Sequence, residues 1–154
     1  MKIVVDDLTG PEIAAFLAEH LDEMRSTSPP ESKHALDLDG LRAPEVTFWS
    51  VHQDGRLVGC GALKELDAST GELKSMRTVR ARKRQGVASA LLQQIVAVAR
   101  ERGYTRLYLE TGSADFFAPA RALYRKFGFE ECEPFADYTD DPLSVYLTRV
   151  LQSS

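Results

Sequence analysis

The feature that most constrains this chain is a basic turn with a glycine that leads directly into an apolar helical segment. Five Lys and Arg residues fall between Arg77 and Arg84, Gly86 follows, and Ala90–Arg102 repeats apolar residues at helical spacing. A helix that starts after such a turn presents unpaired N–H groups and the positive end of its dipole. Arginine forks bind phosphate oxygens in pairs. The junction therefore predicts a phosphate-binding site. The alternative, a charge run in contact with solvent, does not require Gly86.

The composition limits both the class of protein and its partners. The chain of 154 residues is 44% hydrophobic, which favours one domain, residues 1–154, with a core of its own. Because 23 acidic residues outnumber 19 Lys and Arg, the net charge is -4, which argues against a nucleic-acid partner. No apolar run approaches the ~18 residues that cross a bilayer, and the N-terminus lacks the apolar core of a secretory signal. We therefore expect a cytoplasmic protein with neither a membrane nor a nucleic-acid partner.

Cysteine and histidine usage gives no sign of a metal or redox site. Cys60 and Cys132 are too few for a disulfide framework, and neither belongs to a Cys-x-x-Cys motif. No group of His, Cys and Asp residues has the spacing of metal ligands. We expect reduced, packed thiols and no bound metal.

Hydrophobic periodicity and turn residues predict the order strand, helix, three strands, helix, strand, helix and two strands. The first helix begins at Pro11 and stops before Pro29, and the last opens at Pro119 and closes at Gly128. Ser28–Pro44 is expected to be a partly helical loop. We expect the strand after the central helix, Val87–Arg102, to lie parallel to the strand before that helix. The predicted strands are Lys2–Asp6, Val46–His52, Arg56–Leu66, Glu72–Val79, Thr105–Thr111, Phe129–Phe135 and Leu143–Thr148.

Two motifs within this order resemble those of the GNAT N-acetyltransferase superfamily. Lys83–Ala88 reads Lys-Arg-Gln-Gly-Val-Ala, similar to the family's acetyl-CoA signature Arg/Gln-x-x-Gly-x-Gly/Ala between a strand and a helix. Ala120–Phe129 reads Ala-Arg-Ala-Leu-Tyr-Arg-Lys-Phe-Gly-Phe, similar to the signature Ala-x-x-Leu-Tyr-x-x-x-Gly-Phe. Leu73–Thr78, Leu109–Ser113 and Pro134–Tyr138 resemble a bacterial subgroup of these proteins. The resemblance thus covers nearly the whole chain.

The resemblance implies an α/β (α+β) fold and a place for acetyl-CoA. The family's sheet is mixed, mostly antiparallel, flanked by helices, and splayed between the strand ending near Thr78 and the strand ending near Thr111. Acetyl-CoA, the implied co-substrate, would lie in that opening. Strand backbone would hold the pantetheine and orient the acetyl carbonyl, while the basic turn would wrap the pyrophosphate. The cofactor-binding residues that the resemblance implies are Met76, Arg77, Thr78, Lys83, Arg84, Gln85, Gly86, Val87, Ala88 and Ser89.

Two positions depart from the family's pattern. Lys83 stands at the usual Arg/Gln position, which keeps the positive charge but loses the planar fork. Phe117 stands where many members place Asn, three residues before Ala120, so the contact that Asn makes with the cofactor has no counterpart here.

Tyr124, at the tyrosine of the second signature, is the implied acid of the reaction, because a departing thiolate needs a proton. The alternative is an aromatic side chain packed against the sheet. Glu72 and Glu110, on the two splayed strands, are the candidate bases. Each carboxylate could equally be exposed or paired with Lys74 or Arg106. A side-chain base is not required in every case, because many transfers of this type deprotonate the amine through water.

The resemblance places the acceptor site under the segment that runs from His20 through Ser32. The implied substrate-binding residues are His20, Met24, Glu31 and His34. Two alternatives remain open at this point: a packed, hydrogen-bonded histidine at position 20, and a structured surface loop without a ligand.

The sequence therefore predicts an N-acetyltransferase that transfers the acetyl group of acetyl-CoA to a primary amine of a small molecule. A peptide or protein acceptor is the second choice. The alternative class is a non-catalytic acyl-CoA sensor, which the presence of Tyr124 disfavours. A homodimer is the default assembly, because the last strands of such folds often pair between subunits.

Overall fold

A seven-stranded mixed sheet organises the fold. The structure is a computed structural model that describes residues 1–27, 38–79 and 86–151. The strands lie in the order β1-β2-β3-β4-β5-β7-β6, and every neighbouring pair is antiparallel except β4 and β5, which are parallel. The strands are β1 (Lys2–Val5), β2 (Val46–Gln53), β3 (Arg56–Asp67), β4 (Thr70–Thr78), β5 (Arg106–Gly112), β6 (Glu130–Glu131) and β7 (Ser144–Val150).

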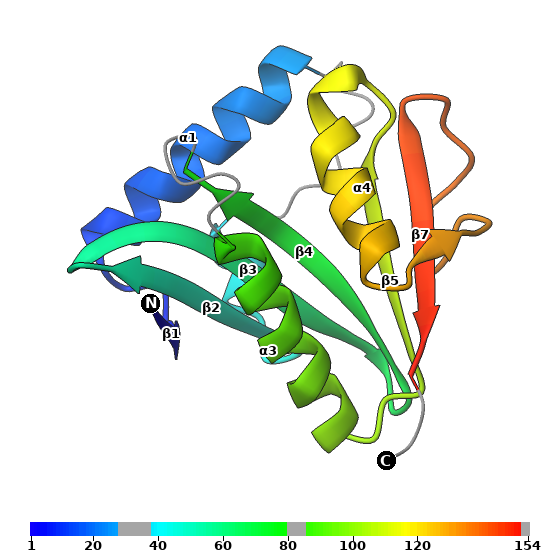
Figure 1. The fold of residues 1–154 in the computed structure, drawn as a ribbon, viewed down its shortest axis with the longest axis horizontal. Coiled ribbons are helices and arrows are strands. Elements are labelled where there is room, and N and C mark those ends of the chain that lie inside the picture. The colour runs from blue at the N-terminus through cyan, green and yellow to red at the C-terminus, as the bar shows by residue number, and fades with distance from the viewer. Residues whose placement is uncertain (28–37, 80–85, 152–154) are drawn as a thin grey trace.

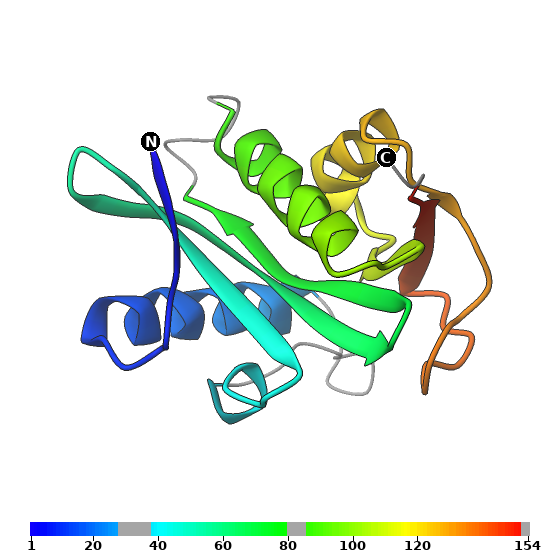
Figure 2. The same ribbon diagram turned by 90° about the horizontal axis from the view of Figure 1, so that it is seen from below.

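Helices cover both faces of this sheet. Figure 2 shows the sheet between two layers, with α3 and α4 on one face and α1 and α2 on the other. Figure 1 shows α3 packed over the β3 and β4 side of the sheet and α4 over β5. The two helices therefore lie on either side of the place where β4 and β5 separate. The helices are α1 (Pro11–Thr27), α2 (Leu38–Leu41), α3 (Val87–Glu101) and α4 (Ala118–Lys126), with a short 3-10 turn, η3 (Asp115–Phe117).

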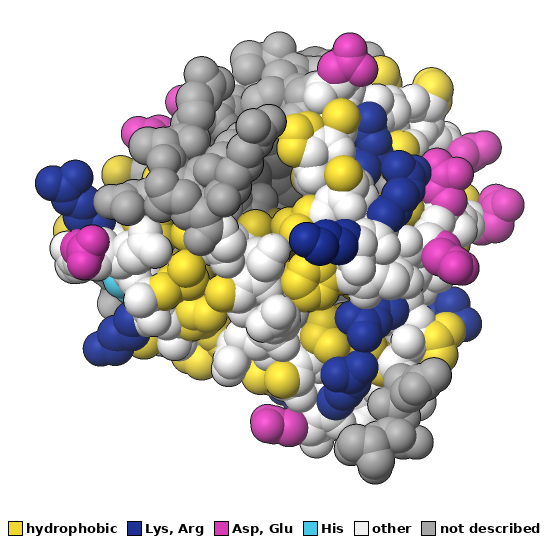
Figure 3. All heavy atoms as spheres, viewed as in Figure 1, with side chains coloured by type: hydrophobic (Ala, Val, Ile, Leu, Met, Phe, Trp, Pro, Cys, Tyr) yellow, Lys and Arg dark blue, Asp and Glu magenta, His cyan; other side chains and the backbone are white. Residues whose placement is uncertain are grey.

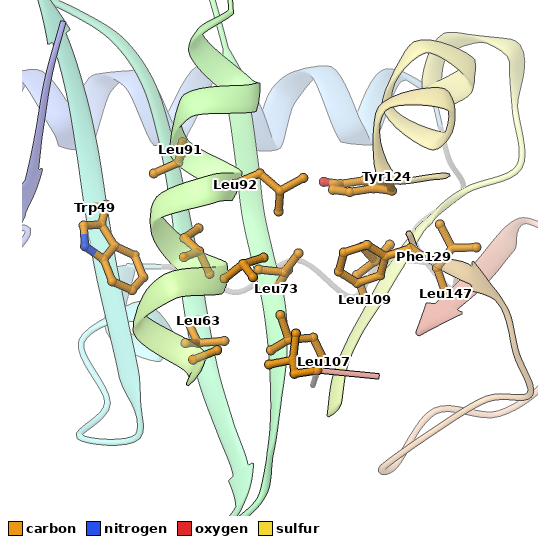
Figure 4. Close-up of a cluster of buried hydrophobic side chains, with 14 of the residues drawn as sticks. Trp49, Leu63, Leu73, Leu91, Leu92, Leu107, Leu109, Tyr124, Phe129 and Leu147 are labelled. Atoms are coloured by element: carbon orange, nitrogen blue, oxygen red, sulfur yellow. The ribbon is translucent and has the colours of Figure 1, made fainter. Parts of the chain in front are cut away.

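The larger core lies beneath α3 and α4. The apolar residues of α3 recur at helical spacing and are buried, and Leu92, Ile95 and Ala99 are fully so. Gly103, with φ +82°, ends the helix in the left-handed conformation that glycine adopts without strain. These side chains belong to one cluster with Leu73 and Leu107 of the sheet, and Figure 4 shows Leu91 and Leu92 of α3 on this side of the sheet. The central helix and its boundaries thus agree with the periodicity of the sequence.

A second core occupies the opposite face. Ile13, Phe16 and Leu17 of α1 pack with Phe48 and Cys60 of the sheet. Because neighbouring strand residues point to opposite faces, Phe48 joins this cluster and the next residue, Trp49, joins the core under α3. Both aromatic side chains of β2 are therefore buried.

The predicted helices and strands are confirmed to within two residues except after α4. Of the loop predicted over Ser28–Pro44, residues 28–37 lie outside the described residues. The strand predicted near Phe129–Phe135 is present but shorter, because only Glu130–Glu131 pair with β7. After a last backbone bond from the Cys132 N–H to the Tyr146 carbonyl, 2.9 Å, the chain leaves the sheet. Pro134 lacks a ladder donor, and Ala136 has φ +51°. The segment instead forms a loop over the edge of the sheet.

Two kinds of feature are missing from the described residues. None of the helices in this part of the chain combines the length and apolar character of a bilayer-spanning helix. Within the same ranges, no three His, Cys, Asp or Glu side chains gather as a metal site would require.

We expect Cys60 to resist alkylation in the folded protein at about pH 8, while Cys132 reacts first. Cys60 has no exposed surface, its S–H donates to the Ser75 carbonyl at 3.2 Å, and burial raises its pKa to about 12. Cys132 is only half buried. Iodoacetamide labelling followed by peptide mass spectrometry, with and without denaturant, measures both thiols. Equal labelling of the two thiols without denaturant would contradict the packing described above.

Candidate active site

The candidate site is an opening between β4 and β5. These strands pair in parallel over four positions only, from Thr70 opposite Arg106 to Leu73 opposite Leu109. Beyond Leu73 the two strands diverge, and Figure 1 shows them splaying apart toward α4. A pocket of about 100 Å³ lies in this opening. The residues that line it are Glu72, Leu73, Lys74, Ser75, Met76, Leu109, Glu110, Thr111, Gly112, Phe117, Ala120, Tyr124 and Tyr138.

A β-bulge bends β4 where the strands part. In the pairing of β3 with β4, Cys60 lies opposite Arg77 and Ala62 opposite Lys74, so two residues of β4 face Gly61 alone. Ser75 in the bulge has φ +56°, a strained conformation for a residue with a side chain. Beyond the bulge, the edge of β4 that faces the opening has no strand partner among the described residues. Its backbone groups can therefore pair with an extended ligand.

The first turn of α3 lies on the same face of the sheet as α4, the helix that lines the opening. Gly86 precedes the helix with φ +83° and is exposed, and no acidic residue stands in the first turn. Val87 is instead buried, and an added Cβ at Gly59 of β3 would come within 2.9 Å of it. The turn thus presents N–H groups and the positive end of a 15-residue helix. The predicted residues Lys83, Arg84 and Gln85 lie outside the described residues.

The guanidinium of Arg77 contacts α1, whereas the sequence grouped Arg77 with the basic residues that precede Gly86. Its guanidinium donates to the Phe16 carbonyl of α1 at 2.6 Å and lies 4.6 Å from the centroid of the Phe16 ring. It also approaches Glu19, with 3.4 Å between Nη2 and Oε2. The alternation of side chains along β4 explains this orientation, because Arg77 points to the face that α1 covers. Only the backbone of Arg77 remains available for the predicted contact with the cofactor.

Lys and Arg side chains gather on the face that carries α3 and α4. Figure 3 shows them over α4 and below it, while Asp and Glu lie mostly toward the rim of this view. Arg125 and Lys126 in the last turn of α4 are exposed members of this group. Although the whole chain is acidic, this face therefore attracts anions.

Tyr124 of α4 lies in the wall of the pocket on the α3 and α4 side. Only 7% of the residue is exposed, and its ring packs edge-on against Phe129, with 5.9 Å between centroids. Figure 4 shows its hydroxyl pointing away from α4, toward Leu92 of α3. Burial raises the pKa of Tyr124 well above its ordinary value of 10. The hydroxyl thus keeps its proton at neutral pH, as an acid requires.

Glu72, Lys74 and Tyr138 form a buried polar cluster on the other side of the pocket. The Lys74 ammonium donates to Glu72 Oε2 at 3.0 Å and to the Tyr138 hydroxyl at 2.8 Å. The Tyr138 hydroxyl in turn donates to Glu72 Oε2 at 2.6 Å. Glu72 therefore has the Lys74 partner that the sequence left as an alternative, and it also lines the pocket.

Glu110, the other candidate base, lines the pocket from β5. Its Oε2 accepts a hydrogen bond of 2.7 Å from the Ser144 hydroxyl of β7. On the neighbouring strand β7, Tyr146 lies opposite Glu110, and the Tyr146 hydroxyl donates to the Thr139 carbonyl at 2.7 Å. The structure thus brings both candidate carboxylates and Tyr124 to one pocket.

The predicted acceptor residues are described only in part. The backbone of His20 and of Met24 lies in α1, the helix that packs on the face where Arg77 points, while their side chains are outside the described set. Glu31 and His34 lie outside the described residues altogether. Tyr138 is a pocket residue that sequence reasoning did not select, whereas Lys74 is one that it named as a possible partner of Glu72. The resemblance of Pro134–Tyr138 to a bacterial subgroup of the family was the sequence feature that could have pointed to Tyr138.

Comparisons with known proteins agree with this geometry. A sequence profile of the acetyltransferase (GNAT) family matches residues 13–129. The uncharacterised N-acetyltransferase YsnE of Bacillus subtilis is 56% identical over 151 residues, which cover 98% of this chain and 100% of that protein.

Two solved structures share the fold. A candidate acyl-CoA N-acyltransferase from Klebsiella pneumoniae superimposes with a TM-score of 0.79 at 30% identity, over 98% of this chain and 97% of the other. A GNAT family acetyltransferase from Elizabethkingia anophelis, solved with acetyl-CoA bound, gives a TM-score of 0.64 at 18% identity over 97% of each chain. The fold and the comparisons together define an enzyme of the acyltransferase class, with N-acetyltransferase activity. The chain belongs to the acetyltransferase (GNAT) family.

Proposed function

We propose that this enzyme transfers the acetyl group of acetyl-CoA to a primary amine of a small molecule, within a single domain formed by residues 1–154. The observation that carries the proposal is the pocket between β4 and β5, which has the buried phenol of Tyr124 on one side and the carboxylates of Glu72 and Glu110 on the other. An acid and candidate bases thus face each other across one small space, as acyl transfer to an amine requires.

The cofactor's place follows from the backbone. The free edge of β4 at Met76, Arg77 and Thr78 suits the amide groups of pantetheine, which can pair as an added strand would. The helix start at Gly86, Val87, Ala88 and Ser89 suits the pyrophosphate. The Elizabethkingia relative, which has acetyl-CoA bound, supports the same co-substrate for this chain.

The proposed reaction proceeds by direct attack. The neutral amine nitrogen attacks the thioester carbon and forms the C–N bond while the carbonyl electrons move to oxygen. When the carbonyl re-forms, the C–S bond breaks, and the departing sulfur takes the proton of the Tyr124 hydroxyl. The surplus proton of the amine leaves to Glu72 or Glu110, directly or through water, and Tyr124 regains a proton from solvent. The products are an amide and free CoA.

Thiol release tests the proposal against the sensor alternative. The purified chain is incubated with acetyl-CoA and, one at a time, amino acids, polyamines, amino sugars and peptides, while calorimetry measures acetyl-CoA binding. Release that depends on an amine supports the transferase. Tight binding without release for any amine would favour the non-catalytic sensor, and absence of binding would overturn both.

Replacing Gly86 by Ala is expected to weaken acetyl-CoA binding about 5- to 30-fold, because Ala relaxes out of the left-handed conformation and binding must restore it at a cost of roughly 1–2 kcal/mol. No atom lies within 4 Å of the added Cβ, so the cost is conformational rather than steric. Calorimetry measures the dissociation constant.

The matched control is Gly103→Ala, at the other end of α3, where φ is +82° and the space is equally open. That variant should lose stability but keep its affinity for acetyl-CoA. Equal loss of affinity in both variants would show that Gly86 acts through the helix as a whole rather than at the cofactor.

The pH profile of kcat/KM is expected to rise as the acceptor amine loses its proton and then to stay level up to about pH 10. Tyr124 must be protonated to act, and its raised pKa keeps it so as pH increases. Initial rates in overlapping buffers measure the profile. A falling limb near pH 9 that disappears in Tyr124→Phe would mean that the hydroxyl ionises more easily than its burial implies.

A further inference from the structure

The buried ammonium of Lys74 is not needed by acetyl transfer as described above. Its side chain is only 8% exposed and that of its partner Glu72 only 3%. Removing two charges from water has a free-energy cost that their attraction offsets only in good geometry, so a buried pair is weak evidence for a stabilising role. This pair lies in the wall of the pocket, where a ligand can reach it.

The pair keeps bonding capacity on its pocket side. Lys74 has three N–H donors, of which Glu72 and Tyr138 use two. Glu72 accepts both of its bonds at Oε2, and no donor among the described residues reaches Oε1. One cationic donor and one anionic acceptor thus remain for a bound molecule.

Tyr138 holds these groups in place. It comes from the loop between β6 and β7, on the far side of the opening from β4, and its hydroxyl bridges Lys74 and Glu72. Its ring packs against Phe135 and Tyr146, with centroids 4.9 and 5.6 Å away. Burial and the neighbouring Glu72 raise the pKa of Tyr138, so it remains a donor. A site whose polar groups are fixed in advance binds without paying to order them.

We infer that the acceptor amine carries a carboxylate on the neighbouring carbon, as a free α-amino acid does, with its carboxylate bound by Lys74 and its amine by Glu72. The inference rests on the proposed acetyl transfer and specifies its acceptor. Opposite charges 3.0 Å apart are matched by a ligand whose own opposite charges stand on adjacent groups. A polyamine would place a second cation beside Lys74, which is unfavourable, and an amino sugar has no carboxylate for Lys74 to bind.

The test compares each free L-amino acid with its amide and with its decarboxylated amine, as acceptors for the wild-type enzyme and acetyl-CoA. We expect at least one amino acid to be acetylated with a kcat/KM about 10- to 100-fold above that of its amide, because the amide offers the remaining N–H of the Lys74 ammonium no charged acceptor. Equal rates for an amino acid and its amide, or acetylation of amines without a carboxylate only, would overturn the inference while leaving the acetyltransferase intact. Transfer to no amine of any class would overturn both.

Two variants test whether Lys74 produces the preference for an acceptor with a carboxylate. Lys74→Gln keeps a donor toward Glu72 but removes the charge, so the ratio of amino acid to amide should fall toward 1. Lys2→Gln, on the edge strand β1, should keep the wild-type ratio. Circular dichroism and acetyl-CoA calorimetry check that Lys74→Gln is folded, and if it is not, the wild-type comparison decides alone. A ratio that survives in a folded Lys74→Gln variant contradicts the assignment of the carboxylate to Lys74.

Discussion

Replacing Tyr124 by Phe should lower kcat by about 10²–10⁴-fold, the range that a positioned general acid contributes. The variant loses one oxygen atom from a ring that is otherwise buried against Phe129. Packing is retained, and the dissociation constant of acetyl-CoA should stay within about twofold of the wild-type value. Steady-state thiol release measures kcat, and calorimetry measures the affinity.

The matched control for this variant is Tyr108→Phe. Tyr108 lies on β5 and stacks on Phe135, with 4.7 Å between centroids, but does not line the pocket. It should retain wild-type turnover. Unchanged turnover in Tyr124→Phe would assign Tyr124 to packing alone, and equal losses in both variants would point to a general effect of removing phenols.

Replacing Phe129 by Ala should destabilise the protein by about 3–5 kcal/mol, because a large cavity opens in the core. Phe129 is 2% exposed and closes the second family signature. Its ring also supports Tyr124, so kcat should fall more than the affinity for acetyl-CoA. Chemical denaturation measures the free energy of unfolding, and thiol release at a temperature where the variant is folded measures kcat.

The variant Phe129→Leu distinguishes the loss of side-chain volume from the loss of the ring contact with Tyr124. It fills most of the space and should cost clearly less stability than Phe129→Ala. A Phe129→Ala variant with full turnover would show that Tyr124 is oriented without Phe129. A loss of stability below about 1 kcal/mol would show that the site collapses around the missing ring.

Local patterns were sufficient for most of the fold. The apolar spacing over Ala90–Arg102 predicted α3, and turn residues separated the predicted strands Val46–His52 and Arg56–Leu66, which form the hairpin of β2 and β3. These signals depend on neighbours in sequence, so periodicity and turn chemistry capture them. The parallel pairing of β4 and β5 followed from the helix between them.

Contacts between distant segments could not be predicted in the same way. The bonds that link Tyr138 to Glu72 and Lys74 join residues more than 60 positions apart. The orientation of Arg77 toward Phe16 depends on which face of β4 α1 covers. No local pattern encodes either contact. The short β6 is a different case, because its pairing with β7 ends after Cys132, next to Pro134 and the positive φ of Ala136. Pro134 was a local signal against a strand as long as Phe129–Phe135.

The most direct test of the central claim follows the acetyl group itself. Acetyl-CoA with an isotopically labelled carbonyl is mixed with the enzyme and the best acceptor of the amine panel, and nuclear magnetic resonance records where the label goes. We predict that the label moves from the thioester to an amide on the acceptor nitrogen, with one free CoA per amide, and that Tyr124→Phe slows this movement without abolishing cofactor binding. Label that stays in the thioester, or appears only as acetate, would contradict the account.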